Sequence, residues 1–263
     1  MLIKKLLYGY RGGINFKYFS QDFYILDEKV KVNLELPICN PIEPQKAKLV
    51  NHPLSSPDWF ENNYNQILHS KYIPIHEAYW FYWPIIPVPF QGELGNLRLN
   101  IAVSKAISPA SNIDELGLII LKEYNDYYNS PVIGKYFKGH NVKLANNVNQ
   151  ELDRRAKKYS KEEREELIES CVNKSGFPEI NHFEKNEFNG LGWIKYVDKR
   201  SEGRKRKYVY ATLLDNDFYL LANFTLVTNM SHSGKKWYKD AETSIPRLME
   251  GINLEFLDVI EKN

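Results

Sequence analysis

The residues of this chain that could carry out chemistry are a set of acidic residues followed by a basic run. Glu184, Glu187 and Asp198, together with Lys185, precede residues 199–207, of which six are Lys or Arg. Carboxylates can hold a catalytic metal ion and basic side chains bind phosphate, so the pattern is compatible with a nucleic-acid-processing enzyme. In that interpretation the nucleic-acid contacts are Arg200, Arg204, Lys205 and Arg206.

The basic run also has a purely structural interpretation. Gly203 interrupts it, and strand patterns precede and follow it, as is typical of a solvated hairpin turn. Its charge would keep the hairpin from pairing edge to edge with other chains. Because dispersed acidic residues occur in most sequences, the enzyme is kept as the alternative and we expect no catalytic residues.

No other pattern indicates a catalytic or cofactor site. The chain lacks a P-loop, a GxGxxG, HExxH or GxSxG motif and an EF-hand loop. None of its six histidines lie four residues apart, as a helical metal site would need. Its two cysteines, Cys39 and Cys171, are far apart in the sequence, which excludes a disulfide framework. We therefore expect no cofactor, no metal ion and no small-molecule ligand.

Composition is that of a globular protein. The 263 residues are 43% hydrophobic and 26% charged, enough to bury a sizeable core. The net charge of +2 is small for a nucleic-acid-binding domain, so nucleic acid is not favoured as a partner. Gly12 and Gly13 interrupt a signal-like start, and no apolar run is long enough to span a membrane. We expect a cytoplasmic protein with no membrane partner.

Apolar patterning predicts an α+β fold of antiparallel β-sheets, built from long hairpins and backed by helices. Alternation of apolar and polar residues predicts a hairpin over residues 23–36 and strands over 97–103 and 192–197. The longest hairpin covers residues 208–228 and turns at 215–217. These elements account for most of the expected sheet.

Capping residues and helical spacing place the helices. One helix is expected to begin at Ser56, another at Ser111 or Asn112, and a third at Trp237. Pro246 should kink or restart the third helix, because proline cannot donate to the helical ladder. Residues 252–256 are expected to form a final strand or a helix tail.

A charged helical insert is predicted over residues 141–178. It contains a capping box, and it separates an N-terminal α/β region, 1–140, from a C-terminal hairpin-plus-helix region, 179–263. The alternative is one continuous domain, 1–263. Glu162, Glu166 and Glu169 form an acidic face that could steer a partner, although a solvated helix with internal ion pairs explains the same charges.

Five consecutive aromatic residues, 79–83, form the candidate binding strand. In a strand such a run projects from both faces, so one set packs on the core and the other is either covered or exposed. Pro84 and the prolines after it indicate an edge strand or an extended loop. Since Tyr and Trp are enriched at binding hot spots, the candidate partner contacts are Tyr79, Trp80, Tyr82 and Trp83.

The C-terminal region carries a family resemblance. Residues 218–224, a polar connection and a helix led by Trp237 are similar to immunity proteins of interbacterial toxins, including those against type VI secretion effectors. The resemblance covers about the last sixty residues. It implies an inhibitor that binds a cognate toxin one to one and occludes its active site. Inhibitors of nucleases are commonly acidic, whereas this chain has a net charge of +2, so the expected toxin is not a nuclease. The lack of a signal sequence predicts that the toxin acts in the cytosol.

These observations predict a protein that is not an enzyme and that binds another protein. Occlusion of an active site needs a large complementary surface and no chemistry. The nucleic-acid enzyme is the first alternative. A structural adaptor that assembles through its aromatic strand is the second.

Overall fold

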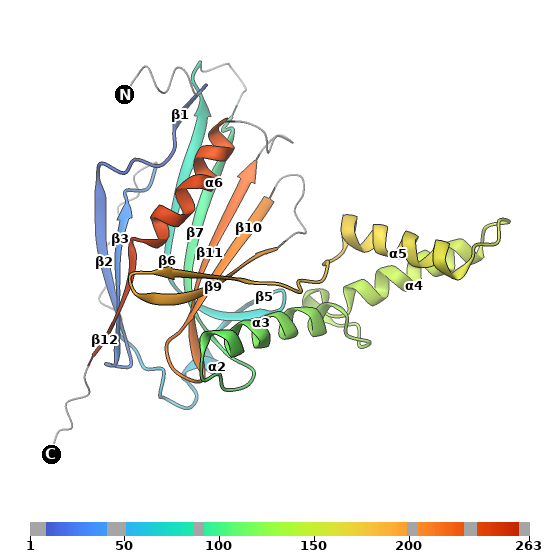
Figure 1. Cartoon of the computed structure of the whole chain (residues 1–263), viewed down its shortest axis with the longest axis horizontal. Helices are drawn as coiled ribbons and strands as arrows, with labels where there is room; N and C mark the ends of the chain where they lie inside the picture. The colour runs from blue at the N-terminus through green and yellow to red at the C-terminus, as the bar shows by residue number, and fades with distance from the viewer. Residues whose placement is uncertain (1–8, 41–50, 87–91, 199–204, 229–235, 258–263) are drawn as a thin grey trace.

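The computed structural model describes residues 9–40, 51–86, 92–198, 205–228 and 236–257, and has the predicted α+β fold (Figure 1). Its large sheet has eight antiparallel strands in the order β1-β6-β7-β11-β10-β9-β8, with β5 paired to β6. The strands are β1 (Tyr10–Gly12), β5 (Asn65–Ile67), β6 (Ser70–Pro84), β7 (Gly95–Lys105), β8 (Glu184–Phe188), β9 (Leu191–Asp198), β10 (Lys205–Leu213) and β11 (Phe218–Thr228).

A small sheet joins the two ends of the described chain. Its order is β12 (Ile252–Phe256), β3 (Val30–Pro37), β2 (Phe19–Leu26) and β4 (Asn51–His52), of which only β4 is parallel to its neighbour. The predicted hairpin 23–36 is confirmed as β2 and β3. Asp27 and Glu28 have φ angles of 56° and 57° at its turn, which matches the twist of a tight hairpin.

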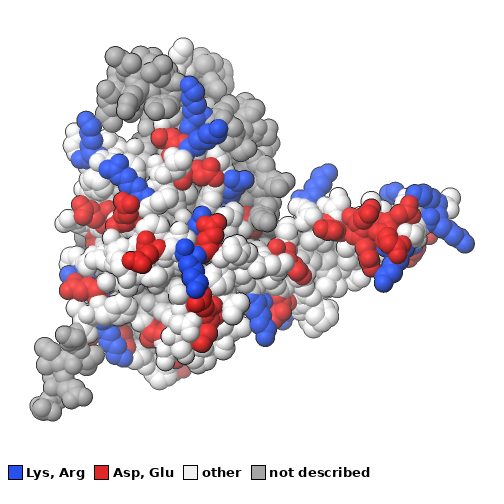
Figure 2. Space-filling model, viewed as in Figure 1, with Lys and Arg blue, Asp and Glu red and all other residues white. Residues whose placement is uncertain are grey.

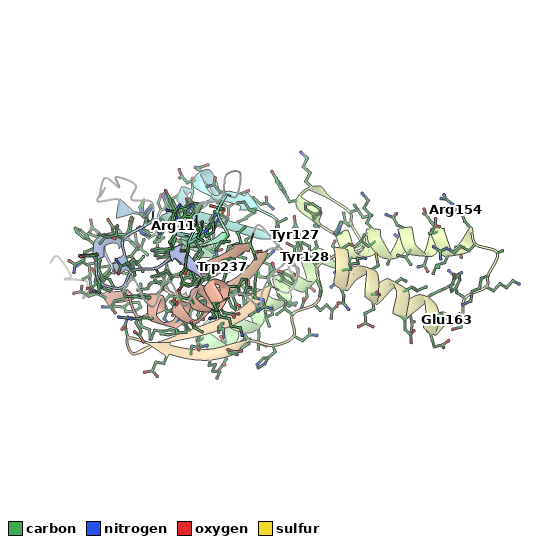
Figure 3. The ribbon with its side chains drawn as sticks, turned by 90° about the horizontal axis from the view of Figure 1, so that it is seen from above. Arg11, Tyr127, Tyr128, Arg154, Glu163 and Trp237 are labelled. Carbon is green, nitrogen blue, oxygen red and sulfur yellow. The ribbon has the colours of Figure 1, made fainter. Side chains whose placement is uncertain are left out.

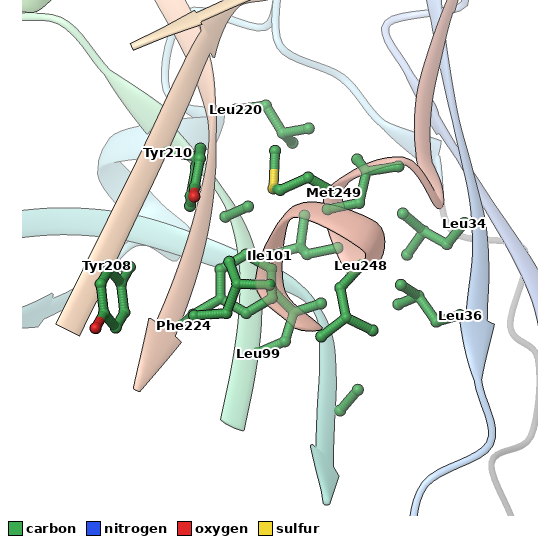
Figure 4. Packing of buried hydrophobic residues seen from close by; sticks show 14 of the residues in the cluster. Leu34, Leu36, Leu99, Ile101, Tyr208, Tyr210, Leu220, Phe224, Leu248 and Met249 are labelled. Carbon is green, nitrogen blue, oxygen red and sulfur yellow. The ribbon is translucent and has the colours of Figure 1, made fainter. Parts of the chain in front are cut away.

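One core lies between the two sheets, and helix α6 (Lys236–Met249) is part of it. Figure 4 shows Leu248 and Met249 between the large sheet's Leu99 and Phe224 and the small sheet's Leu36. The helix runs through Pro246, so the expected restart is wrong. Pro246 lies in the last turn, where it cannot donate a backbone hydrogen bond to the Glu242 carbonyl.

A second core lies on the other face of the large sheet, under helix α3 (Ile113–Tyr128). Asn112 caps this helix, because its side chain accepts from the backbone N–H groups of Asp114 and Glu115, as predicted. Leu116, Ile120 and Tyr124 pack on strands β9, β10 and β11. The helix covers only one end of this face.

The predicted insert is a helical hairpin that projects from the body (Figures 1 and 3). After the short turn η1 (Lys135–Phe137), α4 (His140–Asp153) runs outward and α5 (Lys161–Ser175) returns. The capping box of Ser160 and Glu163 is present, and Gly176 ends α5, both as expected. The regions on either side of the insert share one sheet, because β7 pairs with β11 along its whole length.

Two smaller expectations need correction. The helix expected to begin at Ser56 is only α2 (Trp59–Asn63), with Asp58 at its N-cap and no side-chain cap bond. The aromatic run lies in β6, which pairs with β7 on one side and only briefly with β1 and β5 on the other. It is therefore a long strand next to the edge. Within the described ranges, no helix is long and apolar enough to cross a membrane.

Candidate functional site

Strand β6 divides the aromatic run between two environments. Trp80 and Tyr82 have no exposed surface and face the core between the sheets. The Trp80 indole N–H donates to the Pro37 carbonyl on β3 at 3.2 Å, and Tyr82 packs on Trp237 of α6. The assignment of Trp80 and Tyr82 to a partner-binding surface is therefore wrong, because both side chains join the large sheet to the elements packed on it.

Tyr79, Phe81 and Trp83 project from the opposite face of β6 and are half-buried. The ring centroids of Tyr79 and Phe81 are 5.6 Å apart, and those of Phe81 and Trp83, which stack, are 5.8 Å apart. These three side chains form a continuous aromatic row along the strand. Phe81, which was not among the sequence candidates, is its central member.

The aromatic row forms one wall of an open groove of about 700 Å³, called here the aromatic groove. Polar side chains from β7 and β11 line the rest of it. The described lining residues include Glu77, Glu93, Arg98, Asn100, Asn223 and Thr225. A groove that combines an aromatic wall with convergent charged and amide groups is typical of a recognition site.

Hydrogen bonds between side chains hold the groove's polar groups in place. Asn100 donates to Glu77 at 2.9 Å, and Arg98 Nε donates to Asn96 Oδ1 at 2.9 Å. Asn96 in turn donates to Glu93 at 3.0 Å. Arg98 remains exposed, so its charge is available to a ligand in the groove. Ordered polar groups beside rigid rings reduce the entropy that binding would cost.

A second, smaller pocket of about 280 Å³, called here the inner pocket, adjoins the groove at Asn223, which lines both. Strands β10 and β11 supply its floor, α3 one wall, and the β5–β6 hairpin the other. Asn223 Oδ1 is buried and has no hydrogen-bond partner among the described atoms, so it can accept from a ligand. Other lining residues are His69, Lys71, Ser104, Glu123, Tyr196, Lys207 and Tyr219.

Glu123 gives the inner pocket a proton-exchanging group. Burial raises the pKa of this carboxyl to about 7, although nearby Lys71 acts in the opposite direction. Burial, together with the charge of Glu123, also raises the pKa of Tyr219, so this phenol stays protonated at neutral pH. A carboxyl that titrates near neutrality can donate or accept a proton there. The sequence feature that could have revealed Glu123 is its position one turn after Ile120, on the apolar face of α3.

The acidic candidates lie apart from the groove. Glu162, Glu166 and Glu169 share one exposed face of α5 on the projecting hairpin, where acidic side chains gather (Figure 2). Ion pairs such as Lys161–Glu165 at 3.7 Å run along the same helix. This arrangement is compatible with both interpretations of the sequence: an acidic face that steers a partner, and a solvated helix with internal ion pairs.

The residues of the alternative nuclease site do not converge. Glu184 faces Lys195, with which it forms a 2.7 Å ion pair, on the side of the sheet opposite to Asp198. Glu187 lies on the same face as Asp198 but six positions along β9, at the level of Gly192. Among the described residues, no three His, Cys, Asp or Glu side chains are grouped to hold a metal ion.

The basic contacts of that alternative are only partly described. Arg200 and Arg204 lie outside the described residues, and of Lys205 only the backbone, in β10, is described. Arg206 forms a 3.1 Å ion pair with Glu242 of α6 and also bonds the Tyr208 hydroxyl. Its guanidinium is therefore engaged in attaching α6 to the sheet rather than presented to phosphate.

Comparison with known proteins assigns the chain to no family. No protein-family model and no curated protein matches the sequence. A crystal structure of a protein from Bacteroides thetaiotaomicron is similar over 73% of this chain and 44% of its own length, with 9% identity and a TM-score of 0.20. The chain thus spans less than half of that protein. A TM-score of 0.20 does not indicate a shared fold, so nothing is transferred from it.

Proposed function

We propose that this chain is an inhibitor protein of the immunity type, which binds a cognate toxin one to one and occludes its active site. The observation that carries the proposal is the aromatic groove. Tyr79, Phe81 and Trp83 form a rigid half-buried row beside exposed Arg98. Aromatic residues and arginine are the side chains most enriched at protein–protein hot spots.

The groove suits a protein segment better than it suits a flat contact. It is open to solvent, with aromatic rings on one wall and charged and amide groups of both signs on the rest. An inserted segment would meet apolar surface on β6 and hydrogen-bonding groups on β7 and β11. Burial of such a segment against side chains that are already ordered favours tight binding, because little conformational entropy is lost.

The acidic face of α5 supports the same proposal in a secondary way. It extends away from the body, so its charge acts on an approaching partner before contact is made. Exposed charges of this kind change the association rate more than the dissociation rate. We assign Glu162, Glu166 and Glu169 to steering and the groove to affinity.

The first experiment isolates the partner and then reconstitutes the complex from purified proteins. Titration calorimetry should give a one-to-one complex, and the partner's activity should fall in proportion to its occupancy. Tyr79→Ala and Trp83→Ala should each weaken the complex by about 30-fold, which corresponds to about 2 kcal/mol at a hot spot.

Leu118→Ala is the matched control, because Leu118 is 64% exposed on α3, away from the groove. It should leave the dissociation constant unchanged. If both groove variants bind the partner with wild-type affinity, the groove is not part of the interface. A bound partner that keeps its full activity would refute the inhibitor function even if the groove is the contact.

A further inference from the structure

The loop that joins α3 to α4 presents large apolar side chains to solvent. Val132 is 62% exposed, Ile133 52%, Tyr136 52% and Phe137 53%. They fall within six consecutive residues at the root of the helical hairpin. Isolated exposed apolar residues are ordinary on protein surfaces, but a cluster of this kind marks an interaction site.

The loop holds these side chains outward in a strained backbone. Tyr136 and Phe137 have φ angles of 54° and 68°, a left-handed conformation that costs a non-glycine residue about 1–2 kcal/mol. The Tyr127 hydroxyl, 3.1 Å from the Lys135 carbonyl and 3.2 Å from that of Tyr136, donates to this turn. Strain maintained by specific contacts is characteristic of functional loops.

Three backbone N–H groups of the loop donate to nearby carbonyls. Gly134 N–H donates to the Lys138 carbonyl at 3.0 Å, and Lys138 N–H donates to that of Lys135 at 3.2 Å. Gly139 N–H donates to the Tyr127 carbonyl at 2.9 Å. These bonds lower the cost of moving this part of the loop into an apolar medium, because the groups that they join have no water to lose.

The loop's own sequence is basic, which indicates what it would enter. The carboxylate of Glu179 accepts from Asn129 Nδ2 at 3.2 Å, just before the exposed segment begins. Residues 129–143 contain three Lys and no Asp or Glu, and Lys135 and Lys138 are both exposed. Lysine is depleted at protein–protein interfaces, whereas it commonly accompanies apolar residues at the surface of anionic membranes. Each lysine near such a surface contributes a binding factor of about fivefold.

We propose that loop 130–139 docks this protein on an anionic lipid bilayer, with Val132, Ile133 and Tyr136 inserted at the interface and Lys135 and Lys138 among the headgroups. Loop 130–139 requires no complementary pocket on its partner, because a bilayer deforms around the inserted side chains. The acidic residues of α5 lie toward the far end of the hairpin, where Figure 3 places Glu163. The proposal departs from the expectation, drawn from the sequence, that the protein has no membrane partner. It is independent of the partner-binding function of the groove.

Vesicle co-sedimentation of the whole chain tests this inference. Binding to vesicles of phosphatidylglycerol mixed equally with phosphatidylcholine should be at least tenfold tighter than binding to phosphatidylcholine alone. Lys135→Gln with Lys138→Gln should weaken it by about 30-fold, from the two factors of about fivefold. Val132→Ser with Ile133→Ser should weaken it by about tenfold or more, because apolar area no longer enters the interface.

Matched controls change equally exposed residues elsewhere. Ile107→Ser with Leu118→Ser replaces side chains that are 60% and 64% exposed, and Lys17→Gln with Lys239→Gln removes the same charge. Both should bind vesicles like the wild type. Equal binding to neutral and anionic vesicles would overturn the proposal. So would loss in the lysine variant alone, because that pattern means surface adsorption without insertion.

Discussion

Glu123 shows how a single side chain can carry the pH response of this fold. Its carboxyl lies between α3 and the floor of the inner pocket, where burial favours the neutral form. The pKa rises from 4.5 in the unfolded chain to about 7 in the folded one. The folded state therefore binds this proton more tightly, so its contribution to stability is complete below pH 4.5 and is lost as the pH rises through 7.

Glu123→Gln tests that response. In the wild type, the free energy of unfolding should fall by about 3 kcal/mol at most between pH 4.5 and pH 8, since one pKa unit corresponds to 1.36 kcal/mol. The variant should lack this fall and be the more stable protein at pH 8. Urea denaturation at a series of pH values measures the difference.

Glu187→Gln provides the comparison, because Glu187 is exposed on β8. This control should keep the wild-type dependence on pH. If Glu123→Gln follows the same curve as the wild type, the carboxyl is not held neutral by the pocket.

At the scale of residues, sequence patterns predicted caps well and side-chain directions poorly. Asn112 and Ser160 were found because a cap depends on neighbours within three residues. Trp80 and Trp83 differ only in the face of β6 from which they project. Five consecutive aromatic residues show no alternation of apolar and polar side chains, so the sequence does not indicate which face is buried. Asn223 and Arg98 join the groove through strand pairing, which local spacing does not encode.

At the scale of elements, the α4–α5 hairpin is attached to the body through a compact root. Asn141 donates to the Phe177 carbonyl at 2.8 Å and accepts from the Phe177 N–H at 2.9 Å. Gly176 lies so close that an added Cβ would be 2.8 Å from Asn141 Oδ1. Beyond this root α5 buries no residue, and α4 buries only Leu152 besides Asn141.

Replacement of residues 143–175 by a short Gly-Ser linker should leave the body folded. Neither apolar core contains a residue of the replaced segment, so the melting temperature should change by only a few degrees.

Asn141→Ala, in contrast, should destabilise the body by about 1–3 kcal/mol, because it leaves the buried Phe177 N–H unpaired. Calorimetry of both variants measures this; a linker variant that melts far below the wild type would show that the hairpin stabilises the body.

At the scale of the whole molecule, segments far apart in the sequence build each sheet together. Strand β12 pairs with β3, and β11 pairs with β7, so neither flanking region contains a complete sheet. Sequence patterns identified the individual hairpins, because turn residues and alternation are local signals. They left the boundary at residue 140 or 178 open, because pairing between distant strands depends on the shared core of α6 and both sheets.

Ending the chain after Gly251 tests the contribution of β12. Ile252 and Leu254 are buried, and their loss should cost about 4 kcal/mol or more. Backbone amides of β3 that now pair with β12 should exchange their hydrogens much faster. A chain ended after residue 257 keeps β12 and serves as the control. Unchanged exchange in β3 after removal of β12 would contradict the pairing.

The late position of β12 in the sequence has a consequence for synthesis on the ribosome. The β2–β3 hairpin is made early, but residues 252–256 emerge after every other strand of both sheets. Until they emerge, the nascent chain carries an open strand edge on β3, a template to which another nascent chain can pair. Chains terminated before residue 252 should therefore aggregate in the cell, whereas chains that contain β12 close this edge themselves.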